Sequence, residues 1–142
     1  MTTSILAPAA VLVAWTMVMM LWVLVTRMPA FTNAGIKLTE AAPGARYADA
    51  EAAMPDSVNW KSHNFTHLME QPTIFYAAVC IIALAGGEGT AVLWAWGYTG
   101  LRIAHSLWQS LVNTLPVRLT LFLLSNVCLL VLSYQAVRLT LL

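Results

Sequence analysis

Four long apolar runs dominate this sequence and restrict the folds that it can adopt. The first run extends from Ile5 to Val25, and the second, from about His67 to Ala85, carries the single charge of Glu70. Two further runs cover about Thr90 to Val112 and about Val117 to Leu141. Each run is long enough to cross a hydrocarbon core of about 30 Å as a helix. The sequence therefore predicts four membrane-spanning helices.

The composition also indicates a membrane protein. Hydrophobic residues make up 60% of the chain and charged residues only 9%, with a mean hydropathy of +0.75, whereas soluble proteins average about 25% charged residues. Lipid cannot satisfy backbone hydrogen bonds, and no segment alternates with the period of a barrel strand, so we expect an all-α bundle. We expect one domain over residues 1–142, with helices at about 5–26, 64–85, 90–113 and 117–141 and a polar loop at about 28–62.

The lysines and arginines predict the orientation of this bundle. Arg27, Lys37, Arg46 and Lys61 lie in or beside the polar loop, whereas the turn "GGEG" between the second and third helices has no basic residue. The positive-inside rule therefore places the loop in the cytoplasm and both termini on the other side, with Arg138 as a weak counter-signal. The first apolar run is interpreted as a helix, because it is too long for a signal peptide and lacks a basic start and a small-residue cleavage site.

The third predicted helix carries a polar stripe. In "YTGLRIAHSLWQSLVN", Tyr98, Arg102, His105, Gln109 and Asn113 are spaced by four, three, four and four residues. At about 100° per residue, these side chains fall within one arc of about 100°. A charge near the bilayer centre costs at least about 2.5 kcal/mol and normally faces a partner, a cavity or a water-filled path. We therefore expect this face to point into the bundle.

The second helix offers a partner for Arg102. In "SHNFTHLMEQPTIFY", His63, His67 and Glu70 share one helix face just before Pro72. A Glu70–Arg102 ion pair would hold two helices in register, either as a structural bridge alone or as part of a site. The same face could instead bind a metal through its two histidines and Glu70. Since no cysteine or further carboxylate is nearby, we predict no metal site.

Arg118 follows "NTLP", where the chain enters the fourth helix. Considered alone, it is typical of an interfacial arginine that extends its charge toward the membrane surface. Ser125 lies two turns further along the same face. Cys80 and Cys128 lie in apolar runs and are expected to pack in the core.

As a set, these residues resemble the membrane-associated proteins in eicosanoid and glutathione metabolism (MAPEG), a family that includes microsomal glutathione transferases and microsomal prostaglandin E synthase. The matching features are Glu70 with Phe75 five residues on, Arg102 with His105, Asn113, and Arg118 sixteen residues after Arg102. The stretches "NFTHLMEQPTIFYAAVC" and "LRIAHSLWQSLVNTLPVR" are most similar to the bacterial branch of the family. The resemblance covers residues from about 58 to 140.

The resemblance implies a four-helix subunit in a homotrimer, with glutathione bound between neighbouring subunits. Arg118 would stabilise the glutathione thiolate, which has a physical basis because a cation in a low-dielectric site favours the charged form of a thiol. The residues that would line or brace the glutathione site are Asn64, Glu70, Arg102, His105 and Asn113. Glutathione also carries two carboxylates and an ammonium group, which require cations and a carboxylate such as Glu70.

The implied function is that of a thiol-dependent transferase or peroxidase, in a bacterial inner membrane, acting on a small lipophilic electrophile that enters from the lipid. The alternative is a non-enzymatic trimer of the same fold that binds a lipid or a partner protein. A net charge of +1 without basic clusters argues against a nucleic-acid partner.

The chain differs from the eukaryotic members of the family. These carry further arginines at the end of the first helix and the start of the second, and an asparagine three residues before the glutamate, where this sequence has Pro29, His63 and His67 or their neighbours. The prostaglandin synthase has a tyrosine where this chain has Gln109. Arg27, Lys61 and protonated histidine could partly replace the missing positive charges. Tyr98 or Tyr76 is expected either to donate a hydrogen bond or to pack at a helix surface.

Overall fold

The computed structural model describes residues 4–87 and 89–142, and this part of the chain confirms the predicted all-α fold. The long helices are α1 (Leu6–Asn33), α3 (Asp56–Glu70), α4 (Pro72–Leu84), α5 (Thr90–Leu111) and α6 (Leu115–Leu141). Three short helical turns lie between α1 and α3: η1 (Leu38–Glu40), α2 (Tyr47–Ala50) and η2 (Glu51–Ala53).

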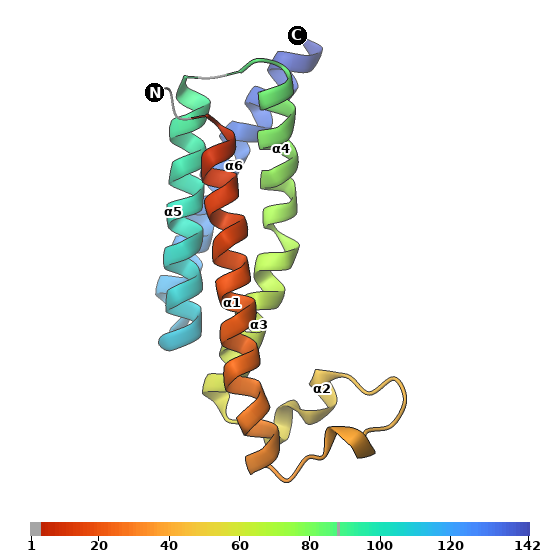
Figure 1. The fold of residues 1–142 in the computed structure, drawn as a ribbon. Helices are drawn as coiled ribbons and strands as arrows, with labels where there is room; N and C mark the ends of the chain where they lie inside the picture. The colour runs from red at the N-terminus through yellow and green to blue at the C-terminus, as the bar shows by residue number, and fades with distance from the viewer. Residues whose placement is uncertain (1–3, 88) are drawn as a thin grey trace.

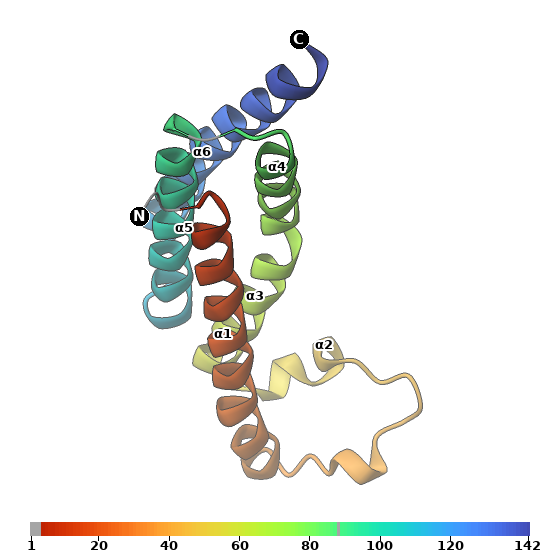
Figure 2. The same ribbon diagram turned by 45° about the horizontal axis from the view of Figure 1, so that its top comes forward.

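The long helices run side by side as one bundle (Figures 1 and 2). The start of α1 and the end of α6 lie at one end of this bundle, and the segment with α2 lies at the other end. α6 packs most extensively against α5, and α3 and α4 follow each other along one side. This arrangement agrees with the predicted separation of the polar loop from both termini.

Apolar side chains from the long helices fill the centre of the bundle. Each long helix presents its most buried apolar residues to this core and leaves many leucines and valines of its other faces exposed. Exposed apolar faces are what a bilayer or a neighbouring subunit would cover. The fully buried core side chains include Leu12, Met19, Phe75, Val79, Ile82, Tyr98 and Leu132.

Three segments of the described residues are long and apolar enough to cross a membrane: Leu6–Asn33, Asp56–Leu84 and Leu115–Leu141. The second of these comprises α3 and α4 with Gln71 between them. α5 has 22 residues, long enough to cross a bilayer, but its polar stripe lowers its hydropathy. Composition alone thus identifies three of the four predicted spans.

Several predicted boundaries differ from the structure. α1 continues to Asn33 instead of ending near residue 26, and α3 begins at Asp56 instead of near residue 64. The apolar runs mark only the lipid-compatible part of a helix, and these two helices extend beyond it into polar sequence. Pro55, with extended backbone angles, precedes the first turn of α3. The connection expected at about 28–62 is therefore shorter, and it contains three helical turns.

The turn between α4 and α5 uses glycines. Gly86 and Gly89 have φ angles of 71° and 74°, which side chains with a Cβ rarely adopt. The turn was predicted to carry no basic residue, and its residue 88 lies outside the described residues. Cys128 is buried as predicted, but the same prediction is wrong for Cys80, which is exposed on α4.

Candidate functional site

The polar stripe of α5 faces the interior of the bundle. Arg102 is fully buried, and His105 and Gln109 are exposed by only 2% and 7%. Leu107 and Leu111 point outward on the opposite side of the same helix. The residues whose spacing predicted one polar helix face therefore form a buried face of α5.

Arg102 does not form the predicted ion pair with Glu70. Its Nη2 atom donates a hydrogen bond to the backbone carbonyl of His67, at 3.3 Å. Within residues 4–87 and 89–142, the Nε and Nη1 atoms of Arg102 have no partner, and ion pairs form only between Lys37 and Glu40 and between His63 and Glu51. The pairing was expected because the spacing placed both charges on facing helices, but Glu70 lies on an exposed face of α3.

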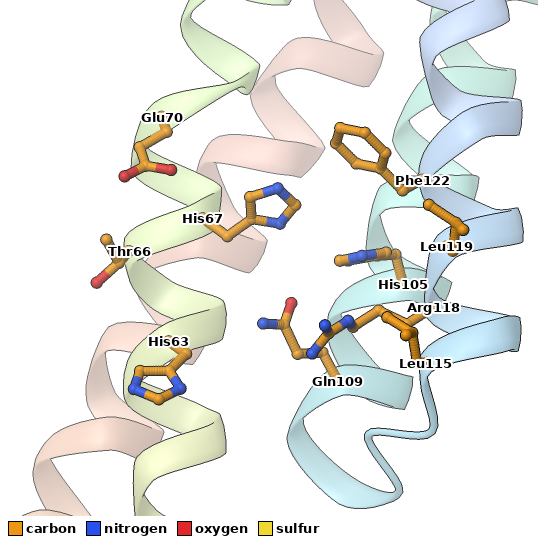
Figure 3. Close-up of a pocket in the computed structure, with 10 residues that line it drawn as sticks. All are labelled: His63, Thr66, His67, Glu70, His105, Gln109, Leu115, Arg118, Leu119 and Phe122. Carbon is orange, nitrogen blue, oxygen red and sulfur yellow. The ribbon is translucent and has the colours of Figure 1, made fainter. Parts of the chain in front are cut away.

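A cavity of about 510 Å³ separates α3 from the corner formed by α5 and α6 (Figure 3). This volume lies within the range of about 300–1,000 Å³ that is usual for small-molecule sites. Figure 3 shows the side chains of His67, His105 and Arg118 directed into the space between the helices, with Glu70 on the side of α3 away from Arg118. The lining residues are His63, Thr66, His67, Glu70, His105, Gln109, Leu115, Arg118, Leu119 and Phe122.

Arg118 is positioned in this cavity by the turn between α5 and α6. Asn113 has a φ angle of 56°, and its backbone N–H donates to the carbonyl of Trp108 at 2.8 Å, which ends α5. Asn113 Oδ1 accepts a hydrogen bond of 2.7 Å from Arg118 Nη1. Asparagine tolerates this left-handed conformation better than most residues. Asn113 therefore holds Arg118 in place and is not itself a lining residue.

Three rings form one wall of the cavity above Arg118. The ring centroids of His67 and His105 are 5.1 Å apart, and those of His67 and Phe122 are 5.5 Å apart. Phe122 was not predicted from the sequence as a site residue, and neither were Leu115 and Leu119. Their spacing of four and three along α6 is the signal that could have identified them, because it puts them on the face that carries Arg118.

Asn64 braces the helices without lining the cavity. It is fully buried, and its Nδ2 atom donates to Ser106 Oγ at 2.7 Å. Trp15 Nε1 donates to the same oxygen at 3.0 Å. This shared acceptor joins α3, α1 and α5, so the predicted site residue Asn64 contributes to the support of the site.

The two tyrosines considered as donors also lie away from the cavity. Tyr98 is fully buried and stacks on Phe75, with ring centroids 4.3 Å apart. Its hydroxyl group contacts Gln71 Oε1 at 3.5 Å. Tyr76 is half-buried beside the core. Both rings pack within the bundle.

The cations proposed to replace the missing arginines do not reach the cavity. Arg27 donates to Ser62 Oγ and its guanidinium lies 3.7 Å from the ring centroid of Tyr47. Burial raises the pKa of Tyr47 above its usual value of 10, so this ring is neutral at physiological pH. Lys61 is buried and donates to the Ser57 carbonyl at 2.8 Å. Arg118 is thus the only fixed cation among the described residues that line the cavity.

The side chains considered for a metal point in different directions. His63 pairs with Glu51 of the connecting segment, whereas His67 contacts the rings of His105 and Phe122. Within the described part of the chain, no three His, Cys, Asp or Glu side chains are grouped closely enough to hold a metal ion.

The cavity combines features that suit a polar ligand with an apolar second substrate. Arg118 supplies a permanent positive charge and Glu70 a carboxylate at the edge. Gln109 Oε1 is a buried acceptor without a partner in the described structure. Leu115, Leu119 and Phe122 supply an apolar wall on α6.

The chain was compared with protein-family models, curated proteins and solved structures. The sequence model described as "MAPEG family" matches residues 5–138, nearly the whole chain. No curated protein and no solved structure matches the chain.

Proposed function

The chain belongs to the MAPEG family, the membrane-associated proteins in eicosanoid and glutathione metabolism, and we propose that it is a glutathione-dependent transferase or peroxidase. The observation that carries this proposal is the position of Arg118. The side chain lines the cavity and is held by Asn113, instead of extending freely from the first turn of α6. A cation held in this way can stabilise an anion that forms beside it.

The residues of the cavity fit glutathione. The tripeptide would supply a sulfur nucleophile when bound. Arg118 would face the thiolate, and the orphaned acceptor Gln109 Oε1 and the carboxylate of Glu70 suit N–H donors, including the ammonium group. Since arginine keeps its charge at all physiological pH values, Arg118 can favour the thiolate without exchanging a proton itself.

The apolar wall on α6 supports a small lipophilic electrophile as second substrate. Leu115 and Leu119 are exposed beside the cavity, and Phe122 closes one side of it. A substrate dissolved in lipid could reach this wall laterally, past α3 and α6. Burial of its apolar surface would stabilise the complex by about 25 cal/mol per Å².

The assembly and location belong to the same proposal. Four spans, with α5 as the fourth, would form one subunit of a homotrimer in a bacterial inner membrane, as in the resemblance to the bacterial branch and the microsomal glutathione transferases. The exposed apolar faces of α1, α4 and α6 would then contact lipid or neighbouring subunits. The segment between α1 and α3, with Lys37 and Arg46, would face the cytoplasm.

One observation favours a second function, that of a non-enzymatic trimer which binds a lipid or a partner protein. Arg27 and Lys61 are engaged outside the cavity, so Arg118 alone would face two carboxylates and a thiolate. A lipid headgroup with one anionic group would need no further cation. The two functions make different predictions for turnover.

The experiment compares Arg118→Ala with the control Arg138→Ala, which removes an exposed arginine near the end of the same helix. The assay measures conjugation of glutathione to an activated aryl chloride, in which a C–S bond forms and chloride leaves, and, separately, reduction of an organic hydroperoxide. We expect Arg118→Ala to lower kcat/KM by about 100-fold, with unchanged oligomer size on gel filtration, and Arg138→Ala to retain activity. Wild-type protein that is folded but inactive in both assays would favour the lipid-binding function.

A further inference from the structure

The candidate site needs a group that accepts the proton of the thiol. Arg118 cannot accept it, because its guanidinium group always stays protonated. The described lining residues that can exchange a proton at neutral or mildly acidic pH are His63, His67, Glu70 and His105. The rings of His67 and His105 pack against each other, and His105 is only 2% exposed. The side chain of His63 is 53% exposed, so a proton taken up by this ring can pass on to water.

His63 is held by a carboxylate from the connecting segment. Its Nε2 atom contacts Glu51 Oε1, and within residues 4–87 and 89–142 this is the only hydrogen bond that the ring makes. An ionised carboxylate can only accept a hydrogen bond, so the hydrogen of the neutral ring lies on Nε2 and the Nδ1 atom is left as an acceptor. A carboxylate that engages one ring nitrogen and leaves the other free is the arrangement that orients the histidine base in Ser-His-Asp sites.

Glu51 is itself fixed to α3 through its backbone. Asn59 lies one turn before His63 on this helix, and its Nδ2 atom donates to the Glu51 carbonyl at 3.0 Å. Asn59 Oδ1 accepts from the hydroxyl group of Tyr47 at 2.7 Å. Both the backbone and the side chain of Glu51 therefore contact α3, so the carboxylate is held at His63 by more than one interaction.

His63 also borders a second cavity. In the candidate site, Figure 3 shows His63 on α3, across the space from Gln109 and Arg118. The second cavity, of about 540 Å³, lies between the connecting segment and the start of α3. The polar and aromatic residues that line it with His63 are Glu51, Asp56, Asn59 and Trp60. Since Asp56 is exposed, this cavity offers a polar route between the His63 ring and solvent.

We propose that His63 accepts the proton of the bound thiol at Nδ1, and that Glu51 is its positioning residue; this inference rests on the proposed function. In this step the S–H bond breaks, an N–H bond forms at Nδ1, and the electron pair stays on the sulfur beside Arg118. Glu51 balances the positive charge of the ring. His63 then returns the proton to water through the second cavity, and the ring is neutral again for the next thiol.

The proposal predicts how activity depends on pH. The charged and titratable groups around His63 are Glu51 from the connecting segment, Asp56 from the start of α3, and Glu70, His67, His105 and Arg118 around the candidate site. At low pH, His63 already carries a proton and cannot accept another. We therefore expect kcat/KM for conjugation to fall as the pH is lowered through the range in which histidine titrates, and we expect His63→Gln to lose this dependence.

The direct test follows thiolate absorbance at about 240 nm after rapid mixing of the purified protein with glutathione at pH 7, in weakly buffered solution. We expect His63→Gln to lower the rate constant of thiolate formation by about 100-fold. The final absorbance should stay close to that of wild type, because the proton ends in water in either case. Arg118→Ala should instead lose the final absorbance, so the two roles give separate signals.

Two ion pairs of the connecting segment provide a matched comparison. Glu51→Gln removes the carboxylate that orients His63 and should slow thiolate formation by about tenfold. The control, Glu40→Gln, breaks the exposed pair of Lys37 and Glu40 in the same segment and should leave the rate unchanged. Equal rates in Glu51→Gln and wild type would overturn the positioning role of Glu51.

Chemical rescue distinguishes a proton acceptor from a structural residue. Free imidazole should restore the rate of thiolate formation in His63→Ala, because solvent reaches this position, and it should not restore the band in Arg118→Ala. A slow rate in His63→Ala that imidazole does not change would overturn the proposal. An unchanged rate in His63→Gln would also overturn it and would leave the proposed function standing. Absence of a thiolate band in wild type would refute the proposed function, and the role of His63 with it.

Discussion

At the residue scale, the left-handed backbone of Asn113 is the feature on which Arg118 depends. Asn113→Gly keeps this conformation available and removes the oxygen that accepts from Arg118. We expect a folded protein with stability close to wild type and a lower kcat for glutathione conjugation, because Arg118 is no longer held. Asn113→Ala should show the same catalytic loss and an added destabilisation of about 1 kcal/mol. Thermal unfolding and steady-state kinetics measure the two effects, and full activity of Asn113→Gly would refute the positioning role.

Ser106 and Ser110 provide a second comparison between single residues. Both are buried on α5, but Ser106 accepts hydrogen bonds from Asn64 and Trp15, whereas the Ser110 hydroxyl group has no partner within the described structure. Ser106→Ala leaves the buried amide of Asn64 and the part-buried indole N–H of Trp15 without an acceptor and should destabilise the protein by about 1 to 3 kcal/mol.

The control, Ser110→Ala, removes a hydroxyl group that makes no bond and should change stability by less than about 0.5 kcal/mol. Chemical or thermal unfolding in detergent compares the two variants. Equal effects would show that the shared acceptor at Ser106 does not join α1, α3 and α5.

At the element scale, a close approach between α5 and α6 limits which side chains α5 can carry. A Cβ atom added to Gly97 would lie 3.4 Å from Cys128 Sγ, whereas one added to Gly100 would meet nothing within 4 Å. A leucine at Gly97 would have to push α6 away, so we expect Gly97→Leu to destabilise the protein by about 2 kcal/mol or more.

Gly100→Leu should be neutral or stabilising by up to about 1 kcal/mol, because leucine favours a helix more than glycine does. Circular dichroism during thermal unfolding gives both values. A loss of stability in Gly100→Leu as large as in Gly97→Leu would indicate that a neighbouring subunit covers Gly100.

The sequence predicted which residues share a helix face better than it predicted which groups those residues contact. The spacing of Arg102, His105 and Gln109 identified the buried face of α5, since periodicity alone determines which side chains share a face. The partner of Arg102 was predicted wrongly. Charge pairing favoured Glu70, but the guanidinium of Arg102 contacts the backbone carbonyl of His67 instead, and spacing alone does not show which backbone groups a side chain reaches.

At the scale of the whole molecule, the cavity depends on residues that come from separate helices. The turn at Asn113 directs Arg118 toward α3, and α3 contributes His67 and Glu70 from the other side. The resemblance to the family identified Arg118, Glu70 and His105 as cavity residues. It did not separate them from Asn64, Asn113 and Arg102, which the structure places behind the cavity wall as supports.

The apolar wall of the cavity shows why the rest of the site could not be predicted from the sequence. Leu115, Leu119 and Phe122 lie in a segment where most residues are apolar, so composition does not distinguish a lining side chain from one that faces lipid. Their spacing places them on the face that carries Arg118, but only the structure shows that this face borders the cavity.

The most direct test of the central claim, that Arg118 stabilises a glutathione thiolate, is ultraviolet difference absorbance at about 240 nm, where a thiolate absorbs more strongly than a thiol. The spectrum of purified protein with glutathione at pH 7 is compared with that of protein with S-methyl glutathione. We expect a thiolate band in wild type and in Arg138→Ala, and its loss in Arg118→Ala. A band that persists in Arg118→Ala, or no band in wild type at millimolar glutathione, would contradict the claim.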